Sequence, residues 1–145
     1  MTVINPYLTF LGDCEAAFNY YKLIFGGEFS TLERFSEMPQ EKDVILSEDE
    51  QNKILHIALP LGDDNVLMGS DAGGHRDART IVGNNISISV SVESKDRAEE
   101  VFEKLSENGA VAMPMEDTYW GEYFGMCTDQ FGINWMVSFN QEDQK

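Results

Sequence analysis

The sequence predicts an α+β domain built from two similar halves, each with the element order βαβββ. In each half an apolar, strand-like run precedes an amphipathic helix pattern, and three further strand-like runs follow that helix. A polar, glycine-containing stretch at residues 71–77 separates the halves. We therefore place a first module at about residues 3–71 and a second at about 84–140. At 145 residues the chain, 1–145, has the size of one ordinary domain.

The first half begins with an apolar run from Ile4 to Leu11, which predicts a strand. Asp13 is the expected cap of the following helix, and the pair Gly26-Gly27 is expected to end it. The predicted buried stripe of that helix is Ala17, Tyr20, Tyr21 and Ile24. Three strands are then expected at residues 29–35, 54–61 and 66–70. Residues 36–52 are interpreted as an acidic mobile loop with at most one short helix or strand.

The second half begins with an unbroken alternation from Ile86 to Val92, which predicts the clearest strand of the chain. Asp96 is the expected helix cap, Glu99 completes a capping box, and Asn108-Gly109 ends the helix. The predicted buried stripe is Ala98, Val101, Phe102 and Leu105. Strands are expected at residues 110–115, 123–128 and 133–139.

Alternation along the strands also predicts which side chains face the helices, since successive residues point to opposite faces of a sheet. The side chains expected on the helix side are those of Ile88, Val90, Trp135 and Val137. The side chains expected on the opposite face are those of His56, Ser87, Ser89, Asn134 and Met136. Such a mixed polar and methionine-containing face either lines a ligand site or is exposed to water.

The charge balance restricts the partners. The chain has 26 acidic and 10 basic residues, a net charge of −16, which argues against nucleic acid and anionic lipid. No stretch approaches the roughly 18 consecutive apolar residues of a membrane span, and the first residues lack the pattern of a leader peptide. We expect a cytoplasmic protein. The acid excess either favours a cationic ligand or serves solubility.

The two cysteines, Cys14 and Cys127, are too few and too far apart for a disulfide framework. Cys14 is expected at a helix N-terminus, where the helix dipole lowers a thiol pKa, but it lacks a basic neighbour. An inert thiol is therefore preferred over a redox function, which ranks last among the functions considered.

Residues 6–13 and, near the C-terminus, 118–121, 124–125 and 129–135 resemble the opening and closing motifs of the PhnB-like proteins. That group belongs to the vicinal oxygen chelate superfamily, which includes glyoxalase I, bleomycin-resistance proteins and extradiol dioxygenases. The resemblance extends from about Ile4 to Phe139. It implies the glyoxalase/bleomycin-resistance fold, in which the two modules curl into a half-barrel around a cleft.

Enzymes of this superfamily usually hold one divalent metal on four ligands, one on the first and one on the last strand of each module. The resemblance places these ligands at Pro6, Met68, Ser87 and Met136, the first with a possible slip to Asn5 or Tyr7. None of the four supplies an imidazole or a carboxylate. We therefore expect no metal and no other cofactor.

These features predict a metal-independent protein that binds a small organic molecule and forms a homodimer, with no catalytic residue assigned. The expected ligand-binding residues are His56, Met68, Ser87, Ser89, Tyr119, Trp120, Asn134 and Met136. A histidine can act as donor or base, aromatic rings suit a flat ligand, and thioethers adapt to different shapes. Ordinary packing is the competing explanation for each of these residue types. His75 is expected to be exposed in the divider.

Two other functions remain open at this point. One is a lyase, isomerase or dioxygenase whose displaced metal site combines His56 with Glu116, Asp117 or Glu122. The other is a resistance protein that sequesters a cationic antibiotic, which the net charge and the aromatic loop would suit.

Overall fold

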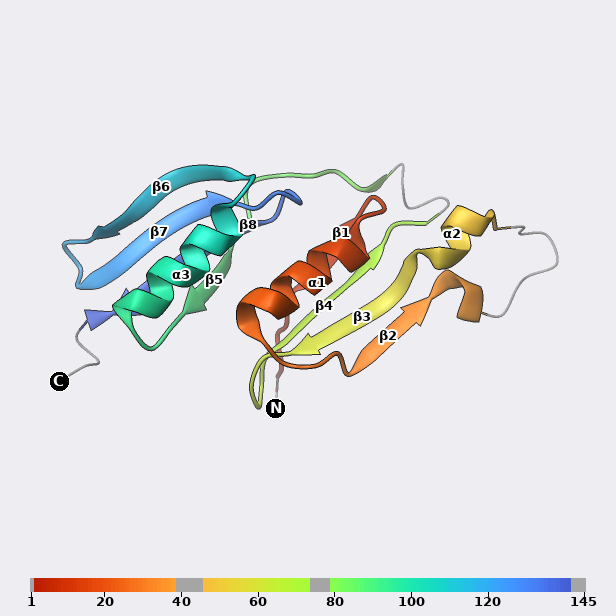
Figure 1. Ribbon diagram of the computed structural model, residues 1–145, viewed down its shortest axis with the longest axis horizontal. Coiled ribbons are helices and arrows are strands. Elements are labelled where there is room, and N and C mark those ends of the chain that lie inside the picture. Colours follow the sequence, from red (N-terminus) through yellow and green to blue (C-terminus); the bar gives the residue numbers. More distant parts are fainter. Residues whose placement is uncertain (1, 39–45, 74–78, 142–145) are drawn as a thin grey trace. The chain divides into compact units, whose positions relative to one another are not determined.

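The computed structural model describes residues 2–38, 46–73 and 79–141. The chain divides into two compact units, Met1–Ile81 and Val82–Lys145. Each unit has a four-stranded sheet with a helix packed on one face (Figure 1). The predicted α+β class and the βαβββ order of the halves are confirmed. Each sheet is open and ends in two edge strands, so neither sheet closes on itself as a barrel.

The first unit contains β1 to β4 and α1, with two short helical segments between β2 and β3. The bounds are β1 Tyr7–Phe10, α1 Cys14–Phe25, β2 Thr31–Arg34, a single 3-10 turn η1 Phe35–Glu37, α2 Glu48–Asn52, β3 Ile54–Pro60 and β4 Val66–Asp71. The strand order is β1-β4-β3-β2, in which β1 runs parallel to β4 and the other pairs are antiparallel. The segment predicted to hold at most one short element holds η1 and α2, while residues 39–45 lie outside the described residues.

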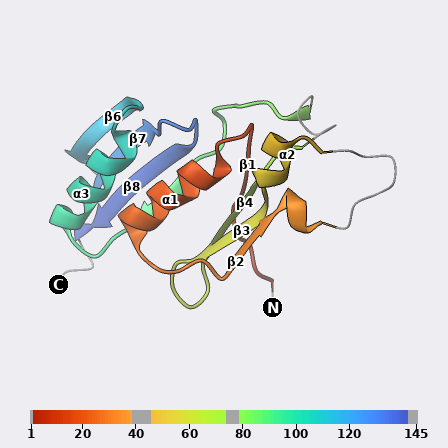
Figure 2. The ribbon, with the colours of Figure 1, turned by 45° about the vertical axis from the view of Figure 1, so that its right-hand side comes forward.

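Helix α1 packs on β3 and β4, as both ribbon views show (Figure 2). A Cβ atom on Gly69 would lie 2.7 Å from Cε1 of Phe18, so the helix approaches the sheet where β4 has no side chain. The buried stripe of α1 is Cys14, Ala17, Phe18, Tyr21 and Ile24. The prediction of Tyr20 in this stripe is wrong, because Phe18 and not Tyr20 has the i, i+3, i+4, i+7 spacing with Cys14 and Tyr21.

The second unit has the same arrangement with fewer insertions. The bounds are β5 Ile88–Ser91, α3 Lys95–Ser106, β6 Ala110–Asp117, β7 Glu122–Thr128 and β8 Asn134–Asn140. The strand order is β5-β8-β7-β6, and β5 runs parallel to β8. Helix α3 buries Ala98, Val101, Phe102 and Leu105, as predicted.

The predicted division of faces in the second unit agrees with the strand register. Ile88 pairs with Trp135 and Val90 with Val137. Val137 also pairs with Gly125, whose Cβ atom would lie 3.0 Å from the Phe102 ring of α3. These four apolar side chains therefore face α3, and Ser89 and Met136, which pair with each other, face the opposite side.

The predicted helix caps need correction. Asp13 occupies the N-cap position of α1, but its side chain accepts no cap hydrogen bond. Ser94 caps α3 instead of Asp96, and its hydroxyl accepts from the backbone N–H of Arg97 at 3.0 Å. Glu99 makes no capping box, because the N3 residue after the Ser94 cap is Arg97. The Glu99 carboxylate instead accepts a hydrogen bond from the hydroxyl of Tyr123.

Within residues 2–38, 46–73 and 79–141, no helix is both long and apolar enough to cross a membrane.

Candidate functional site

In the first unit, the face of the sheet opposite α1 carries the candidate residues His56 and Met68. Tyr7 pairs with Met68, and Met68 pairs with Ala58, which gives one row of side chains across three strands. Thr9 pairs with Ser70 in the next row. Continuing the β3–β4 register by one residue from Ile57–Gly69 places His56 opposite Ser70.

His56 and Tyr7 contact each other on this face. Their rings stack with centroids 5.7 Å apart and 17° between the planes. The Tyr7 hydroxyl and Nδ1 of His56 lie 3.3 Å apart, within hydrogen-bonding distance. Tyr7 remains 46% exposed, so one side of this pair is open to an incoming molecule.

Ser70 is the residue on this face that the sequence interpretation missed. It is 1% exposed, and its hydroxyl is the buried side-chain oxygen for which the described residues provide no hydrogen-bond partner. An unsatisfied buried hydroxyl costs on the order of 1–3 kcal/mol. Alternation along β4 could have identified Ser70, because it places Met68 and Ser70 on the same face.

The neighbouring residue Asp71 has a structural role. Oδ1 of this buried carboxylate accepts from the backbone N–H groups of Gly12 and Cys14, each at 3.0 Å. Oδ2 accepts from the N–H of Ile54 at 2.9 Å. Asp71 thereby links the end of β4 to the start of α1 and the start of β3.

In the second unit, the face opposite α3 is rich in methionine and serine. Met136 pairs with Ser89 on one side and with Met126 on the other, and Met126 pairs with Met113. In the adjacent row the hydroxyls of Ser91 and Ser138 lie 3.3 Å apart. This row of three thioethers is an adaptable apolar surface with hydroxyl groups at its edge.

Asn134 has structural contacts that the sequence did not indicate. Its Oδ1 accepts from the hydroxyl of Thr128 at 2.7 Å. Its Nδ2 lies 3.3 Å and 3.2 Å from the carbonyl oxygens of Gly83 and Ile86, to which it donates. The amide thus holds the segment that leads into β5, and these bonds use its oxygen and both of its N–H groups. Ser87 lies in that segment, just before β5.

Tyr119 and Trp120 lie in the turn between β6 and β7 and form an aromatic cluster with Phe124. The rings of Tyr119 and Trp120 are 4.9 Å apart edge to face, and Trp120 meets Phe124 at 5.9 Å. Tyr119 is 98% exposed and Trp120 48% exposed. The indole N–H of Trp120 donates to Oε2 of Glu122 at 3.2 Å.

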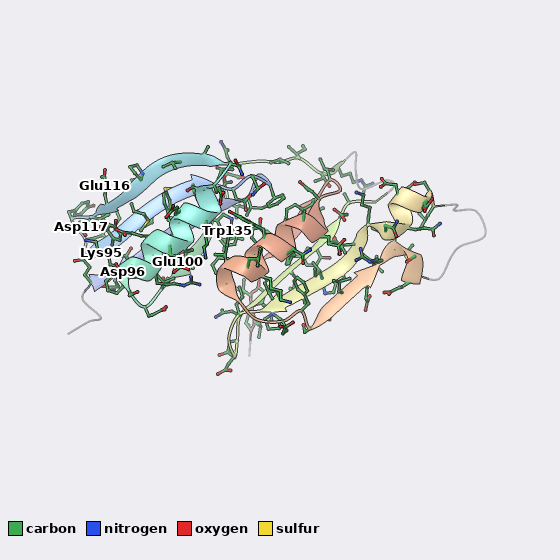
Figure 3. All side chains as sticks on the ribbon, in the orientation of Figure 1. Lys95, Asp96, Glu100, Glu116, Asp117 and Trp135 are labelled. Carbon is green, nitrogen blue, oxygen red and sulfur yellow. The ribbon has the colours of Figure 1, made fainter. Side chains whose placement is uncertain are left out.

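Tyr123 belongs to the α3 side of the sheet and not to this aromatic cluster. Its hydroxyl donates to Glu99 at 2.8 Å, and this hydrogen bond to the neutral phenol raises the pKa of Tyr123 to about 12. Nζ of Lys95 lies 4.4 Å from the centre of the Tyr123 ring and 3.6 Å from Oδ1 of Asp117. Figure 3 shows Lys95 and Asp117 close together at this end of the unit. Asp117 is therefore already paired.

Both cysteines are buried free thiols. Burial, followed by the nearby Asp71 carboxylate, raises the pKa of Cys14 far above the ordinary range. Burial and then Asp129 raise the pKa of Cys127 to about 11. A thiol needs a lowered pKa to act as a nucleophile near neutral pH, so both environments oppose redox or nucleophilic chemistry.

The donor set does not fit the superfamily's metal. Among residues 2–38, 46–73 and 79–141, no group of three or more His, Cys, Asp and Glu side chains is arranged to hold an ion. The register places Tyr7 beside Met68 and Ser89 beside Met136, so Tyr7 and Ser89, in place of Pro6 and Ser87, neighbour the two methionines. A phenol, a hydroxyl and two thioethers are poor ligands for Zn²⁺, Ni²⁺ or Fe²⁺ at such a site. His75 lies outside the described residues.

Two repeated βαβββ modules, each with a four-stranded sheet and a helix on one face, define the class of protein. The chain belongs to the Glyoxalase/Bleomycin resistance protein/Dioxygenase superfamily, whose family model matches residues 3–137.

Individual relatives cover nearly the whole chain. Protein YjdN of Escherichia coli (strain K12) is 26% identical over 141 residues, which is 93% of each chain. The crystal structure of protein PA1353 from Pseudomonas aeruginosa is 37% identical with a TM-score of 0.81, covering 97% of this chain and 99% of that one. The PhnB protein from Bacillus cereus has a TM-score of 0.71 at 23% identity, covering 95% and 99%. The last of these supports the fold alone.

Proposed function

We propose that this protein binds a small organic molecule without the superfamily's usual divalent metal. The observation that carries the proposal is the composition of the faces opposite α1 and α3. These faces present Met68, Met126 and Met136 with a few hydroxyl groups and His56. Ligand sites combine such an apolar lining with a small number of polar groups, whereas a face that only meets water needs no row of thioethers.

The proposal treats modules 3–71 and 84–140 as one functional domain, with His56, Met68, Ser87, Ser89, Tyr119, Trp120 and Met136 contacting the ligand. Asn134 is retained as a positioning residue, because its amide fixes the segment that contains Ser87. The expected compartment is the cytoplasm.

The first prediction is that binding does not require metal. In a thermal-shift screen of drug-sized organic molecules, ligands present at about 100 times their Kd should stabilise the protein by about 2.7 kcal/mol. The shift should be the same with and without EDTA. Elemental analysis of protein purified without a metal-affinity tag should find far less than one metal per chain. Stoichiometric Zn, Ni, Fe or Mn that EDTA removes together with ligand binding would refute the proposal.

The exposed aromatic cluster favours a second candidate, the binding of a cationic drug. The faces of Trp120 and Tyr119 can bind a cation, and Glu122 places a carboxylate 3.2 Å from the indole nitrogen. If this candidate is correct, basic aromatic compounds should bind more tightly than neutral compounds of the same shape, and salt should weaken only the former. If the basic compounds bound with equal affinity at low and high salt, the binding of a cationic drug would be excluded.

We also propose a homodimer, on the argument that open sheets with unpaired edges favour association. The eight-residue edge strand β6 is exposed along most of its length, including Val111 and Met113. Light scattering at physiological salt should give about twice the monomer mass of 16.4 kDa. A mass near 16.4 kDa across micromolar concentrations would show that the dimer is absent.

A further inference from the structure

The hydroxyl of Ser70 is the starting point, because it is buried and the described part of the chain leaves it without a partner. The repeat gives an internal comparison. Ser70 pairs with Thr9 of the parallel strand β1, and Ser138 of the second unit pairs in the same way with Ser91 of β5. Ser138 has a hydroxyl partner at 3.3 Å in Ser91. At the same position in the fold, the serine hydroxyl of the second unit therefore has a hydrogen-bond partner, whereas that of the first unit has none among the described residues.

The surroundings of Ser70 define the chemistry that would satisfy it. His56 is opposite Ser70 by the strand register, and Met68 and Ala58 form the adjacent apolar row. Glu33 pairs with His56 from the other side. The paired residues that share this face are Tyr7, Thr9, Thr31, Glu33, His56, Ala58, Pro60, Val66, Met68 and Ser70. Arg34 pairs with Ile54 beyond a register shift in β2, and its guanidinium donates to the Glu15 carboxylate at 2.6 Å. Among these described residues the one guanidinium is already paired with Glu15, so an anion would meet no unpaired cation among them.

We propose that Ser70 and His56 form the hydrogen-bonding point for an uncharged organic ligand that presents a hydroxyl or carbonyl oxygen. The apolar part of that ligand packs on Met68 and Ala58. This inference rests on the proposed function and assigns its polar contact to the first unit. The Ser70 hydroxyl can donate to a carbonyl oxygen or accept from a hydroxyl, and a histidine ring offers one donor and one acceptor when neutral.

Tyr7 stacks on the His56 side of this point. Its contacts with His56 on this face are the ring stack and one hydrogen bond of 3.3 Å, which is long for an oxygen donor. Because Tyr7 is 46% exposed, its ring can turn toward solvent with little loss of packing. Side-chain rotations of this kind are common when ligands bind. A ligand oxygen can then reach the His56 ring, which the register places opposite Ser70.

The test uses three probes of similar shape, benzamide, benzoate and toluene, and the full-length protein labelled with ¹³C at the methionine methyl groups. Titration of the Met68 methyl signal gives the affinity of each probe. Benzamide should bind. Benzoate should bind at least about ten-fold more weakly, because no unpaired cation among the described residues of this face meets its charge. Toluene should also bind more weakly, because it cannot make the hydrogen bond.

The decisive variant is Ser70→Ala, with Ser138→Ala as its matched control. Ser70→Ala should weaken the binding of benzamide about five-fold and leave the affinity for toluene unchanged, since only the hydrogen bond is removed. Its melting temperature should stay the same or rise, because an unsatisfied hydroxyl has been deleted. Ser138→Ala should leave the binding of benzamide at Met68 unchanged. It should lower the melting temperature by about 2 °C, because it removes the hydrogen bond between the hydroxyls of Ser138 and Ser91.

The outcomes separate this inference from the broader function. Unchanged benzamide affinity in Ser70→Ala, or a melting temperature as low as that of Ser138→Ala, would overturn the role of Ser70. Probes that shift Met126 and Met136 but not Met68 would also overturn it, while leaving small-molecule binding intact. Probes that shift none of these signals would count against both.

Discussion

Asp71→Asn is expected to lower the free energy of unfolding by about 3 kcal/mol, although the substitution changes one atom. The Asp71 carboxylate accepts three backbone hydrogen bonds, from Gly12, Cys14 and Ile54. An asparagine has one acceptor oxygen, so its NH₂ group must face at least one of these N–H groups. Two donors are then buried against each other at the junction of β4, α1 and β3, where Asp71 is 1% exposed.

Asp64→Asn is the matched control, because Asp64 is exposed in the turn between β3 and β4. In urea unfolding at pH 7, the free energy of unfolding of this control should differ from that of the unsubstituted protein by no more than about 0.5 kcal/mol. If Asp71→Asn also changed stability by less than about 1 kcal/mol, the three hydrogen bonds could not be what joins these elements.

Trp135→Ala is expected to lower the free energy of unfolding by about 4 kcal/mol, whereas Met136→Ala should lower it by only about 1 kcal/mol. These adjacent residues of β8 face opposite sides of the sheet. Trp135 is 2% exposed on the α3 side, and its indole N–H donates to Oδ2 of Asp129 at 2.8 Å. Its removal leaves a cavity and takes a donor from a buried carboxylate. Met136 is only half-buried on the opposite face.

Trp135→Phe separates the two contributions, because it retains an aromatic ring and removes the N–H group. In urea unfolding it should lower the free energy of unfolding by about 2 kcal/mol, a value between those of Trp135→Ala and Met136→Ala. Ligand affinity should show the reverse order, with Met136→Ala weakening binding and Trp135→Phe leaving it unchanged. If Met136→Ala destabilised the protein as much as Trp135→Ala, the division of faces would be wrong.

The sequence predicted the elements and faces that depend on local periodicity. The alternation around Ile88 and Trp135 and the helix stripe around Val101 needed only the periods of two and 3.6 residues, and the structure agrees with both. The resemblance to the PhnB-like proteins identified the superfamily from motifs spread over both modules.

The contacts that the sequence did not predict are made between residues far apart in the chain. Asp71 was interpreted as the first residue of a polar divider, but its partners Gly12 and Cys14 lie 59 and 57 residues away. Periodicity does not encode such long-range pairing.

The same limit applies to the candidate site. The sequence did not indicate that the Asn134 amide donates to the carbonyl groups of Gly83 and Ile86, about 50 residues away. Alternation along β4 places Ser70 on the same face as Met68, but it does not single Ser70 out from the other polar residues of that face. Its importance follows only from burial and from the absence of a partner among the described residues, neither of which a sequence reveals.

The central claim, small-molecule binding on the faces opposite the helices, is tested most directly by the methionine methyl spectrum of the protein with a ligand from the thermal-shift screen. The methyl signals of Met68, Met126 and Met136 should shift, because these residues line the proposed faces. The signal of Met115 should not, since its sulfur lies on the α3 side, 2.6 Å from the position of a Cβ atom on Gly125. A ligand that shifted Met115 and left the other three unchanged would contradict the account.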